Sequence, residues 1–589
     1  MSRRQRILFI AVAAAVALTR LAALSRTLWD WDEVLFSTAL HHFDVAAHHP
    51  HPPGFPLYVF LGRLVRLVIH DDFRALQSIN LVAAMLLFPA VFLLARAFRF
   101  DFATSMSGAL LFAFLPNVVF FGGTAFSDVP SLTVLLFALA MLLRGRESRR
   151  DFFLGCLLLG IALAFRPQNL IVAAYPLLAA SWARFRARWL DVVAGAAIVT
   201  AIVVVSYGTA AYVTGFDAYR VAIRKHSDYL MVIDSYRNPD RLPIRTIFPQ
   251  FLLHPFGGSR VVIGLCIAAA IAIVAARPRL RTLEVLATFA PFFLTGVLLL
   301  NVESSSRYSI TWLVGICLLA AEGLRVISQS GDFVAALRRP LLAVLTVVFV
   351  AKEAQFAERS LREPRATVSP TIAAVRWIRA HVPLSSTLYV ARDMQAFADA
   401  YLGDYTQAPV RPDGSFDVRD ARGAWLVREW SSPSPDAINF TRARHELFDL
   451  VRQRYFEVSV QPLSDQARYI DGWYDAESSG PSVWRWMAQR SLTHLPPISG
   501  EGELWMRIFL PLDAARHPTV TVTFNGATID RFVCTTAVVE RTYHLASRLG
   551  TPNELRLEVD QIVNPANEHL MDDGRDLGIQ LRGIAWRSH

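Results

Sequence analysis

The sequence predicts a polytopic α-helical membrane domain of about eleven spans, followed by an exported α/β subdomain and a C-terminal β-sandwich. Of the 589 residues, 53% are hydrophobic and 18% are charged, and the mean hydropathy is +0.35. This composition is too apolar for a soluble enzyme of this length. Apolar runs of about 20 residues recur in the first part of the chain, and short alternating patterns follow them. We expect the membrane domain at 1–352, the α/β subdomain at 353–479 and the sandwich at 480–589.

The predicted spans are apolar runs of near-bilayer length. They lie near residues 7–25, 76–95, 103–121, 128–143, 152–165, 168–183, 190–213, 260–276, 283–301, 309–327 and 339–352. The fifth, sixth and last are short, so the count has a margin of about one or two. The first run follows "SRRQR", as a signal peptide would, but Arg20 interrupts its end and no clean cleavage site follows. We expect a retained anchor.

The arginine-rich loops predict the orientation of these spans. When the spans are threaded in order, "RAFRF", "RGRESRR", "RFRAR", "RPRLR" and "LRR" all fall on the side of the N-terminus. Because basic residues collect in cytoplasmic loops, we expect a multi-pass protein of the cytoplasmic (inner) membrane, surrounded by membrane lipids, with a cytoplasmic N-terminus. An odd number of spans then places the C-terminal domains in the periplasm or outside the cell.

Several classes of partner and site are disfavoured by the sequence. The net charge is +10, but no basic run interleaved with aromatic residues is present, so we expect no nucleic-acid partner. The four cysteines include no CxxC pair and no zinc-like spacing. The subdomain after the membrane domain lacks GxGxxG and P-loop motifs, which leaves no support for a nucleotide site.

The C-terminal part changes from helical to mixed and then to β patterns. "TIAAVRWIRAHV" and "HELFDLVRQRYF" have helical periodicity, whereas "STLYVARD" and "GAWLVRE" are typical of buried strands. From about residue 480 onward apolar and polar residues alternate, and Asn525 and Gly526 form a hairpin signal. We expect a jelly-roll-like sandwich whose role is open between glycan binding, acceptor presentation and stabilisation.

Acidic residues begin two segments on the predicted external face. "WDWDEVLFSTALHHF" places Asp32 and Glu33 at the start of an amphipathic segment at the water boundary, and "SDVP" places Asp128 at the start of a span. Helix capping explains such acids and is favoured on local evidence, since Asp and Ser are good N-caps and proline suits a first turn. The gathering of these segments on one face favours a shared site.

Two arginine motifs fall on the same face. "RPQ" places Arg166 and Gln168 between two short spans, where an arginine is costly unless it is paired or solvated. Interfacial snorkelling and an anion site for a lipid phosphate are equally compatible with it. "ESSSRY" contains Glu303, Arg307 and Tyr308 at a span boundary. Tyr308 fits an interfacial belt, and Arg307 is the better phosphate ligand because its planar fork matches phosphate geometry.

The histidines of the first external loop suggest a metal site at first sight. His41, His42, His48, His49 and His51 lack the regular spacing with a carboxylate that zinc sites usually show. The identity of any metal ligand therefore stays unknown, and no cofactor is certain. His51 stands apart because two prolines follow it and hold the backbone rigidly.

In this order, the motifs resemble the GT-C class of integral-membrane glycosyltransferases, which includes protein O-mannosyltransferases and the aminoarabinose transferase of lipid A. The matching stretches are the acidic "DE" after the first span, "HPPGFPLYVFLGRL", "LPNVVFFGGTAFSDVPSLTVLLFALAM" and "SRYSITWLVGICLLAAEGL". The "HPPGFPLY" segment is similar to the branch with "HPPGYPL". The resemblance covers roughly residues 1–352, and its specificity comes from the order and sidedness of short motifs.

The resemblance implies an inverting transferase that moves a hexosyl or pentosyl unit from a polyprenyl-phosphate donor to a glycan, lipid or protein acceptor. The candidate catalytic residues are Asp32 as general base, with Glu33 and Asp128. The candidate donor and phosphate ligands are His51, Arg166, Gln168, Arg307 and Tyr308. His51 occupies a position where relatives often have lysine or histidine, and a partly neutral histidine is a weaker phosphate partner.

The resemblance leaves three points open. The base assignment can move by a position or two, because Asp30 and Glu33 flank Asp32. Some members of the class require a divalent metal and others do not, and Asp32 and Asp128 could share one. The alternatives to a transferase are a transporter or flippase of lipid-linked glycans and a noncatalytic glycan-binding membrane scaffold. A transporter usually keeps ionisable residues inside its spans and has internal repeats, which this sequence does not show convincingly.

Overall fold

The computed structural model divides the chain into two compact units. One unit is formed by Met1–Ser369, and the other by the described residues from 370 onward. The structure describes residues 1–239, 241–253, 261–300, 305–330, 335–410, 424–429, 437–441, 457–462, 468–479, 482–495, 500–510, 516–547, 552–568 and 573–588. The predicted helix "HELFDLVRQRYF" and Glu303 lie outside the described residues.

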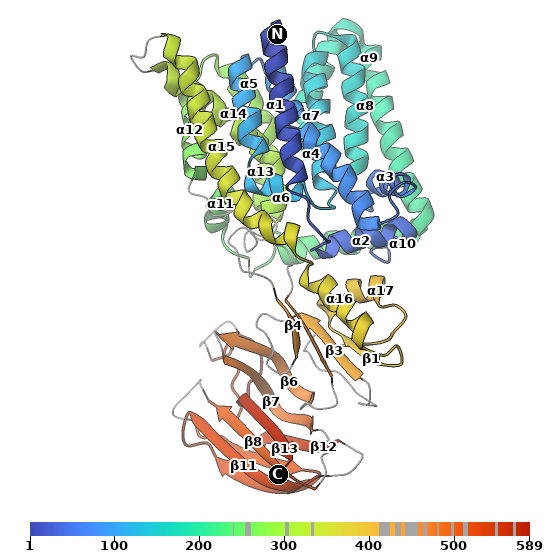
Figure 1. The fold of residues 1–589 in the computed structure, drawn as a ribbon, viewed down its shortest axis with the longest axis vertical. Coiled ribbons are helices and arrows are strands. Elements are labelled where there is room, and N and C mark those ends of the chain that lie inside the picture. The colour runs from blue at the N-terminus through green and yellow to red at the C-terminus, as the bar shows by residue number, and fades with distance from the viewer. Residues whose placement is uncertain are drawn as a thin grey trace. The chain divides into compact units, whose positions relative to one another are not determined.

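The first unit is helical throughout its described length (Figure 1). Its helices are α1 (Arg3–Leu21), α2 (Trp31–His41), α3 (Pro56–Arg66), α4 (Asp72–Ala97), α5 (Phe102–Ala113), α6 (Pro116–Phe121), α7 (Asp128–Gly145), α8 (Arg149–Phe165), α9 (Asn169–Thr214), α10 (Phe216–Tyr229), a π-helical turn η1 (Leu230–Asp234), α11 (Ile244–Leu253), α12 (Val261–Ala275), α13 (Arg279–Leu299), α14 (Ser305–Ser330) and α15 (Ala335–Ala366). A large apolar core runs through the bundle and includes Phe88, Phe112, Leu139 and Trp312.

Each predicted span falls on a helix, which confirms the helical membrane domain. Within the described residues, six helices are long and apolar enough to cross a membrane, and two shorter apolar helices, Phe102–Ala113 and Val262–Ala275, accompany them. The 46-residue α9 contains two predicted spans, because Arg188 has non-helical backbone angles and separates them. The predicted span at 103–121 is broken into α5 and α6, since Pro116 begins a new helix.

The two ends of the bundle have different chemistry. The N-terminus lies at one end, and α2 and α10 lie at the other (Figure 1). Ion pairs connect the arginine-rich loops: Arg99 with Glu147 at 3.1 Å, Arg146 with Glu284 at 2.6 Å and Arg149 with Asp191 at 3.0 Å. The loops that the sequence places on one side are therefore joined to one another. The acidic segments at the starts of α2 and α7, with their partners, belong to the opposite end.

A buried carboxylate holds the start of α2 in place. Asp30 is the N-cap, and Glu33 completes a capping box by accepting the backbone N–H groups of Trp29 at 2.7 Å and Asp30 at 3.0 Å. The other Glu33 oxygen accepts the N–H of Ala125 at 2.8 Å. Glu33 is fully buried. The first turn of α2 is thus fastened to the loop that precedes α7.

Gly123 lets the same loop approach the end of α1. A Cβ at this position would stand 1.8 Å from the carbonyl oxygen of Ala23, so no other residue fits without a backbone shift. The carbonyl oxygen of Gly123 accepts the N–H of Ser25 at 3.1 Å and the side-chain amide of Gln77 at 2.7 Å. The segments before α2 and before α7 are therefore held against each other by backbone contacts.

The second unit begins with a small α/β layer. Its elements are α16 (Pro370–His381), β1 (Thr387–Val390), the 3-10 turn η3 (Arg392–Met394), α17 (Gln395–Tyr401), β2 (Thr406–Pro409), β3 (Ala424–Glu429), β4 (Ile438–Phe440) and β5 (Val458–Pro462). The strand order is β2-β1-β3-β5-β4, with β1 parallel to both β2 and β3, and with antiparallel pairing of β5 to β3 and β4. The helix and strands predicted around residues 371–429 are confirmed.

The remaining strands form one eight-stranded sheet. They are β6 (Arg468–Ser479), β7 (Ser482–Leu495), β8 (Glu501–Phe509), β9 (Thr519–Phe524), β10 (Ala527–Val533), β11 (Val538–Ala546), β12 (Asn553–Val559) and β13 (Gln580–Ser588), in the order β10-β9-β12-β7-β13-β8-β11 with β6 on β7. Asn525 and Gly526 both have positive φ and connect β9 to β10, as their hairpin signal predicts. The strand-rich C-terminal domain is confirmed, with its strands in one continuous ladder around a single apolar core.

The Glu33 clamp yields a stability prediction. In Glu33→Gln, one buried oxygen becomes an amide nitrogen, so at least one backbone N–H loses its acceptor. We expect the free energy of unfolding to fall by about 1–3 kcal/mol, measured as a lower thermal midpoint of the purified protein in detergent. Glu147→Gln is the control, because Glu147 is 81% exposed and pairs only at the surface. Equal midpoints for the two variants would contradict the clamp.

Candidate active site

Asp32 lies in the first turn of α2, between the two residues of the capping box, Asp30 and Glu33. Its backbone N–H donates to the carboxylate of Asp30 at 2.9 Å, so the capping role belongs to Asp30. Its own Oδ2 accepts a hydrogen bond from Nη1 of Arg307 at 2.6 Å, and Oδ1 lies 3.6 Å from Nδ1 of His51. The side chain keeps 21% of its surface exposed. Asp32 therefore combines a fixed orientation with access to a ligand.

Asp128 and Arg166 form a buried ion pair beside it. Oδ2 of Asp128 accepts Nη2 of Arg166 at 2.7 Å, and both side chains are at most 6% exposed. Ser127 occupies the N-cap position of α7 without a capping hydrogen bond, and its hydroxyl instead accepts Nε of Arg166 at 3.1 Å. The guanidinium of Arg166 lies over the ring of Phe55, 5.1 Å from its centroid. Arg166 is thus paired inside the protein instead of reaching to the interface.

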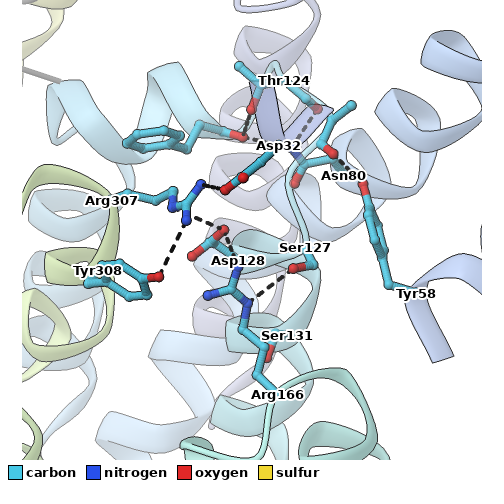
Figure 2. A network of polar contacts seen from close by, with 12 residues as sticks. Asp32, Tyr58, Asn80, Thr124, Ser127, Asp128, Ser131, Arg166, Arg307 and Tyr308 are labelled. Carbon is cyan, nitrogen blue, oxygen red and sulfur yellow. Dashed lines mark hydrogen bonds and ion pairs between the residues drawn. The ribbon is translucent and has the colours of Figure 1, made fainter. Parts of the chain in front are cut away.

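Arg307 stands between the two aspartates (Figure 2). Besides its bond to Asp32, its Nε lies 3.9 Å from Oδ2 of Asp128, and its Nη2 donates to the hydroxyl of Tyr308 at 3.3 Å. The guanidinium also lies over the ring of Phe126 at 4.9 Å. The result is a chain of alternating charges, Asp32–Arg307–Asp128–Arg166, contributed by α2, α14, α7 and the end of α8.

His51 lies in the loop before α3, against the same chain of charges. Its ring contacts Phe55 at 4.8 Å, and the ring of His226, on α10, lies 6.2 Å away. The pKa of His51 is lowered to about 4. Burial is the largest cause, the charge of Asp32 opposes it, and the charges of Arg307 and Arg166 act in the same direction as burial. His51 is therefore neutral near pH 7. A neutral imidazole can give a phosphate one hydrogen bond but no charge.

Gln168 and Tyr308 line a small pocket on the far side of Arg166. Asp128, Arg166, Gln168, Asn169 and Tyr308 contribute its polar surface, together with Ser131 and Thr311, and Leu132 and Phe292 contribute its apolar surface. The amide of Asn169 donates to Ser131 at 2.8 Å. The pocket gives the site a polar wall beside the Asp128–Arg166 pair.

Glu33 is placed differently from the other acidic candidates. Burial raises its pKa to about 7, which is the range of a general base, while three backbone N–H groups act against this shift. Its oxygens are engaged by those backbone groups, and the residue is fully buried. The geometry gives Glu33 a structural contact and leaves Asp32 as the carboxylate that a substrate can reach.

Two contributors were not singled out by the sequence. Ser127, in the "SDVP" motif, is indicated by the sequence only as a helix cap, yet its hydroxyl helps to hold Arg166. His226 comes from the long external loop, which the sequence places on the correct face without marking any residue in it. The only signal for His226 was that placement, because a single histidine on an amphipathic helix has no pattern of its own.

The site does not fit a divalent metal shared by Asp32 and Asp128. A guanidinium lies between these carboxylates, and each carboxylate is paired with an arginine at 2.6–2.7 Å. A cation placed between them would be repelled by Arg307. Within the part of the chain that the structure describes, no three His, Cys, Asp or Glu side chains gather as metal ligands.

Comparison with known proteins gives matches in structure alone. No protein-family model and no curated protein sequence matches the chain. ArnT from Cupriavidus metallidurans bound to undecaprenyl phosphate aligns with a TM-score of 0.51 at 13% identity, covering 78% of this chain and 98% of that one. The Archaeoglobus fulgidus oligosaccharyltransferase gives 0.47 at 11% identity, covering 72% and 69%. The mycobacterial arabinofuranosyltransferase AftD gives 0.42 at 11% identity, covering 100% and 61%.

At such identities the likeness concerns the fold, and the ArnT alignment is the one that supports it. That alignment spans nearly the whole of ArnT and more than three quarters of this chain. The chain therefore has the fold of the GT-C class of integral-membrane glycosyltransferases.

Proposed function

We propose that this protein is an inverting glycosyltransferase that moves a sugar from a polyprenyl-phosphate donor to an acceptor hydroxyl at the external face of the cytoplasmic membrane. One observation supports this function above the others. A partly exposed carboxylate, Asp32, pairs with the buried Arg307 in a GT-C fold, and the buried Arg166 is linked to them through Asp128. This combination supplies a proton acceptor and an anion-binding group within one site.

Asp32 acts as the general base. An alcohol is a poor nucleophile, and a carboxylate within hydrogen-bond reach can take its proton as the new bond forms. The acceptor oxygen attacks the anomeric carbon from the side opposite the phosphate, and the bond from that carbon to the phosphate oxygen breaks. The bonding electrons leave with the phosphate, and the acceptor proton stays on Asp32 until water removes it.

Arg307 and Arg166 stabilise the phosphate that leaves. Negative charge grows on its oxygens during the reaction, and preorganised cations in a water-poor site stabilise such charge strongly. The planar guanidinium can bind two phosphate oxygens at once. Gln168 and Tyr308 line the pocket beside Arg166, and His51 adds an uncharged hydrogen bond.

The acceptor class stays general: a glycan, a lipid or a protein hydroxyl. ArnT was solved with undecaprenyl phosphate, which supports a lipid-linked donor, and the oligosaccharyltransferase was solved with a tethered acceptor peptide. The gathering of arginines at the end of the bundle near the N-terminus supports a cytoplasmic N-terminus and an external site. The second unit would then lie outside the cytoplasm.

The base assignment predicts the effect of Asp32→Asn. The amide cannot accept the acceptor proton, so we expect transfer to fall by roughly 10²–10⁴-fold while the protein still inserts and folds. The measurement is release of polyprenyl phosphate from radiolabelled polyprenyl-phosphate sugar in proteoliposomes. Asp217→Asn is the control, because this aspartate of α10 is 94% exposed and pairs with Arg220 at the surface.

The same assay separates a transferase from a transporter. A transporter would move the labelled donor across the bilayer intact, and a transferase cleaves it. Undiminished release of polyprenyl phosphate by Asp32→Asn would move the base to another residue. Intact movement without cleavage by the wild-type protein would replace the proposed function.

The pKa of His51 predicts a pH dependence of stability. Because the pKa is about 4 in the folded protein and 6.5 ordinarily, folding favours the neutral ring. The associated stability is fully present above pH 6.5 and is lost as the pH falls through 4, by about 3 kcal/mol at most. His51→Gln cannot titrate, so its thermal midpoint should fall less than that of the wild type over this window. Parallel midpoint curves for the two proteins would refute a depressed His51 pKa.

A further inference from the structure

The guanidinium of Arg307 serves two groups that have opposite needs during the reaction. It donates to Asp32 at 2.6 Å, and this carboxylate must take a proton. A guanidinium bound to a carboxylate stabilises the charged form and makes it a poorer proton acceptor. The same guanidinium is the cation best placed to stabilise the leaving phosphate. Arg307 cannot satisfy both groups fully at one time.

Arg307 has unused hydrogen-bonding capacity in the described structure. Its Nε is buried and has no hydrogen-bond acceptor among the described residues, since the nearest carboxylate oxygen, on Asp128, lies 3.9 Å away. A buried N–H without an acceptor is unfavourable. A phosphate oxygen could take up this N–H. Arg166 differs, because its Nε and Nη2 already have acceptors on Ser127 and Asp128.

The charges of the site also favour an exchange of partners. Asp32 and Asp128 carry two negative charges, and Arg166 and Arg307 carry two positive charges, so the group is neutral without substrate. A sugar phosphodiester adds one negative charge. When the bond breaks, the phosphate gains a second negative charge while Asp32 becomes neutral by accepting the proton. The total charge is therefore constant through the step, but one negative charge moves from Asp32 to the phosphate. Arg307 stays next to that charge when it turns from Asp32 toward the phosphate.

We propose that Arg307 is a positioning residue that restrains the base until the donor binds: the donor phosphate competes with Asp32 for the guanidinium and frees the carboxylate for the acceptor hydroxyl. This inference rests on the proposed function. It makes donor binding a requirement for base activity and orders the two substrates, donor first. In this scheme the Asp128–Arg166 ion pair stays formed throughout, and Arg307 is the residue that changes its partner.

Competition has a consequence that a simple binding or structural role lacks. If Asp32 and the phosphate compete for Arg307, removal of the Asp32 charge must strengthen phosphate binding, although it abolishes transfer. We expect Asp32→Asn to lower the Kd for undecaprenyl phosphate by roughly ten-fold, within the usual range of coupling between linked sites. The measurement is equilibrium binding of undecaprenyl phosphate to the full-length protein in nanodiscs, which requires no turnover.

The control removes the same charge from a similar pair elsewhere. Asp72, on α4, pairs with Arg66 at 2.5 Å and with His41 at 2.7 Å, and neither partner belongs to the site. Asp72→Asn should leave the Kd unchanged. The double variant Asp32→Asn with Arg307→Gln tests whether the gain acts through Arg307, because a double-mutant cycle isolates that coupling. Arg307→Met replaces Arg307→Gln if the latter is not recovered folded.

The outcomes distinguish this inference from the proposed function. Tighter binding by Asp32→Asn that disappears in the Arg307→Gln background supports competition for the guanidinium. Unchanged or weaker binding by Asp32→Asn overturns it, and so does a gain that persists without Arg307, because the effect would then be a general loss of repulsion. If the wild-type protein does not bind undecaprenyl phosphate at all, the polyprenyl-phosphate donor itself is wrong.

Discussion

The site depends on one constraint: buried charges at the edge of a membrane domain must neutralise one another. Removing an ion from water is costly by several kcal/mol, and good geometry with an opposite charge is needed to offset this cost. Asp128 and Arg166 satisfy this condition with a 2.7 Å contact between side chains at most 6% exposed. Arg307 extends the neutral group to Asp32, the most exposed member. Asp32, Arg307, Asp128 and Arg166 therefore neutralise one another in the absence of substrate.

The helical scaffold could be predicted from the sequence because it depends on local properties. Length and hydropathy mark each span, and arginine content marks which loops gather together. The same reasoning placed Asp32, Asp128, Arg166 and Arg307 on one face. It could not choose among Asp30, Asp32 and Glu33, because all three suit a helix start. The choice depends on two distant contacts. The N–H of Ala125, 92 positions away, engages Glu33, and Arg307 engages Asp32.

The sequence also could not predict which charged side chains form ion pairs with each other. Arg166 was compatible with snorkelling or with an anion site, and its partner Asp128 lies 38 positions away. Arg307 and Asp32 are separated by 275 positions, and nothing in either motif identifies the other. Tertiary packing of α2, α7 and α14 brings them together. In the second unit, by contrast, the Asn525–Gly526 turn was predictable because positive φ at both positions is a local requirement.

The choice of arginine at position 307 has a physical consequence for how the site can work. A lysine presents one compact charge, and its transfer from a carboxylate to a phosphate would leave one of them without a partner during the exchange. A guanidinium is a planar fork whose N–H groups point in several directions, so Nε can meet a phosphate oxygen before Nη1 leaves Asp32. The ring of Phe126, at 4.9 Å, packs against the face of the guanidinium. Tyr308, whose ring lies at 5.2 Å, also accepts Nη2, and Nε stays available for a phosphate oxygen. The geometry therefore allows a gradual exchange in which the charge of Arg307 is never unpaired.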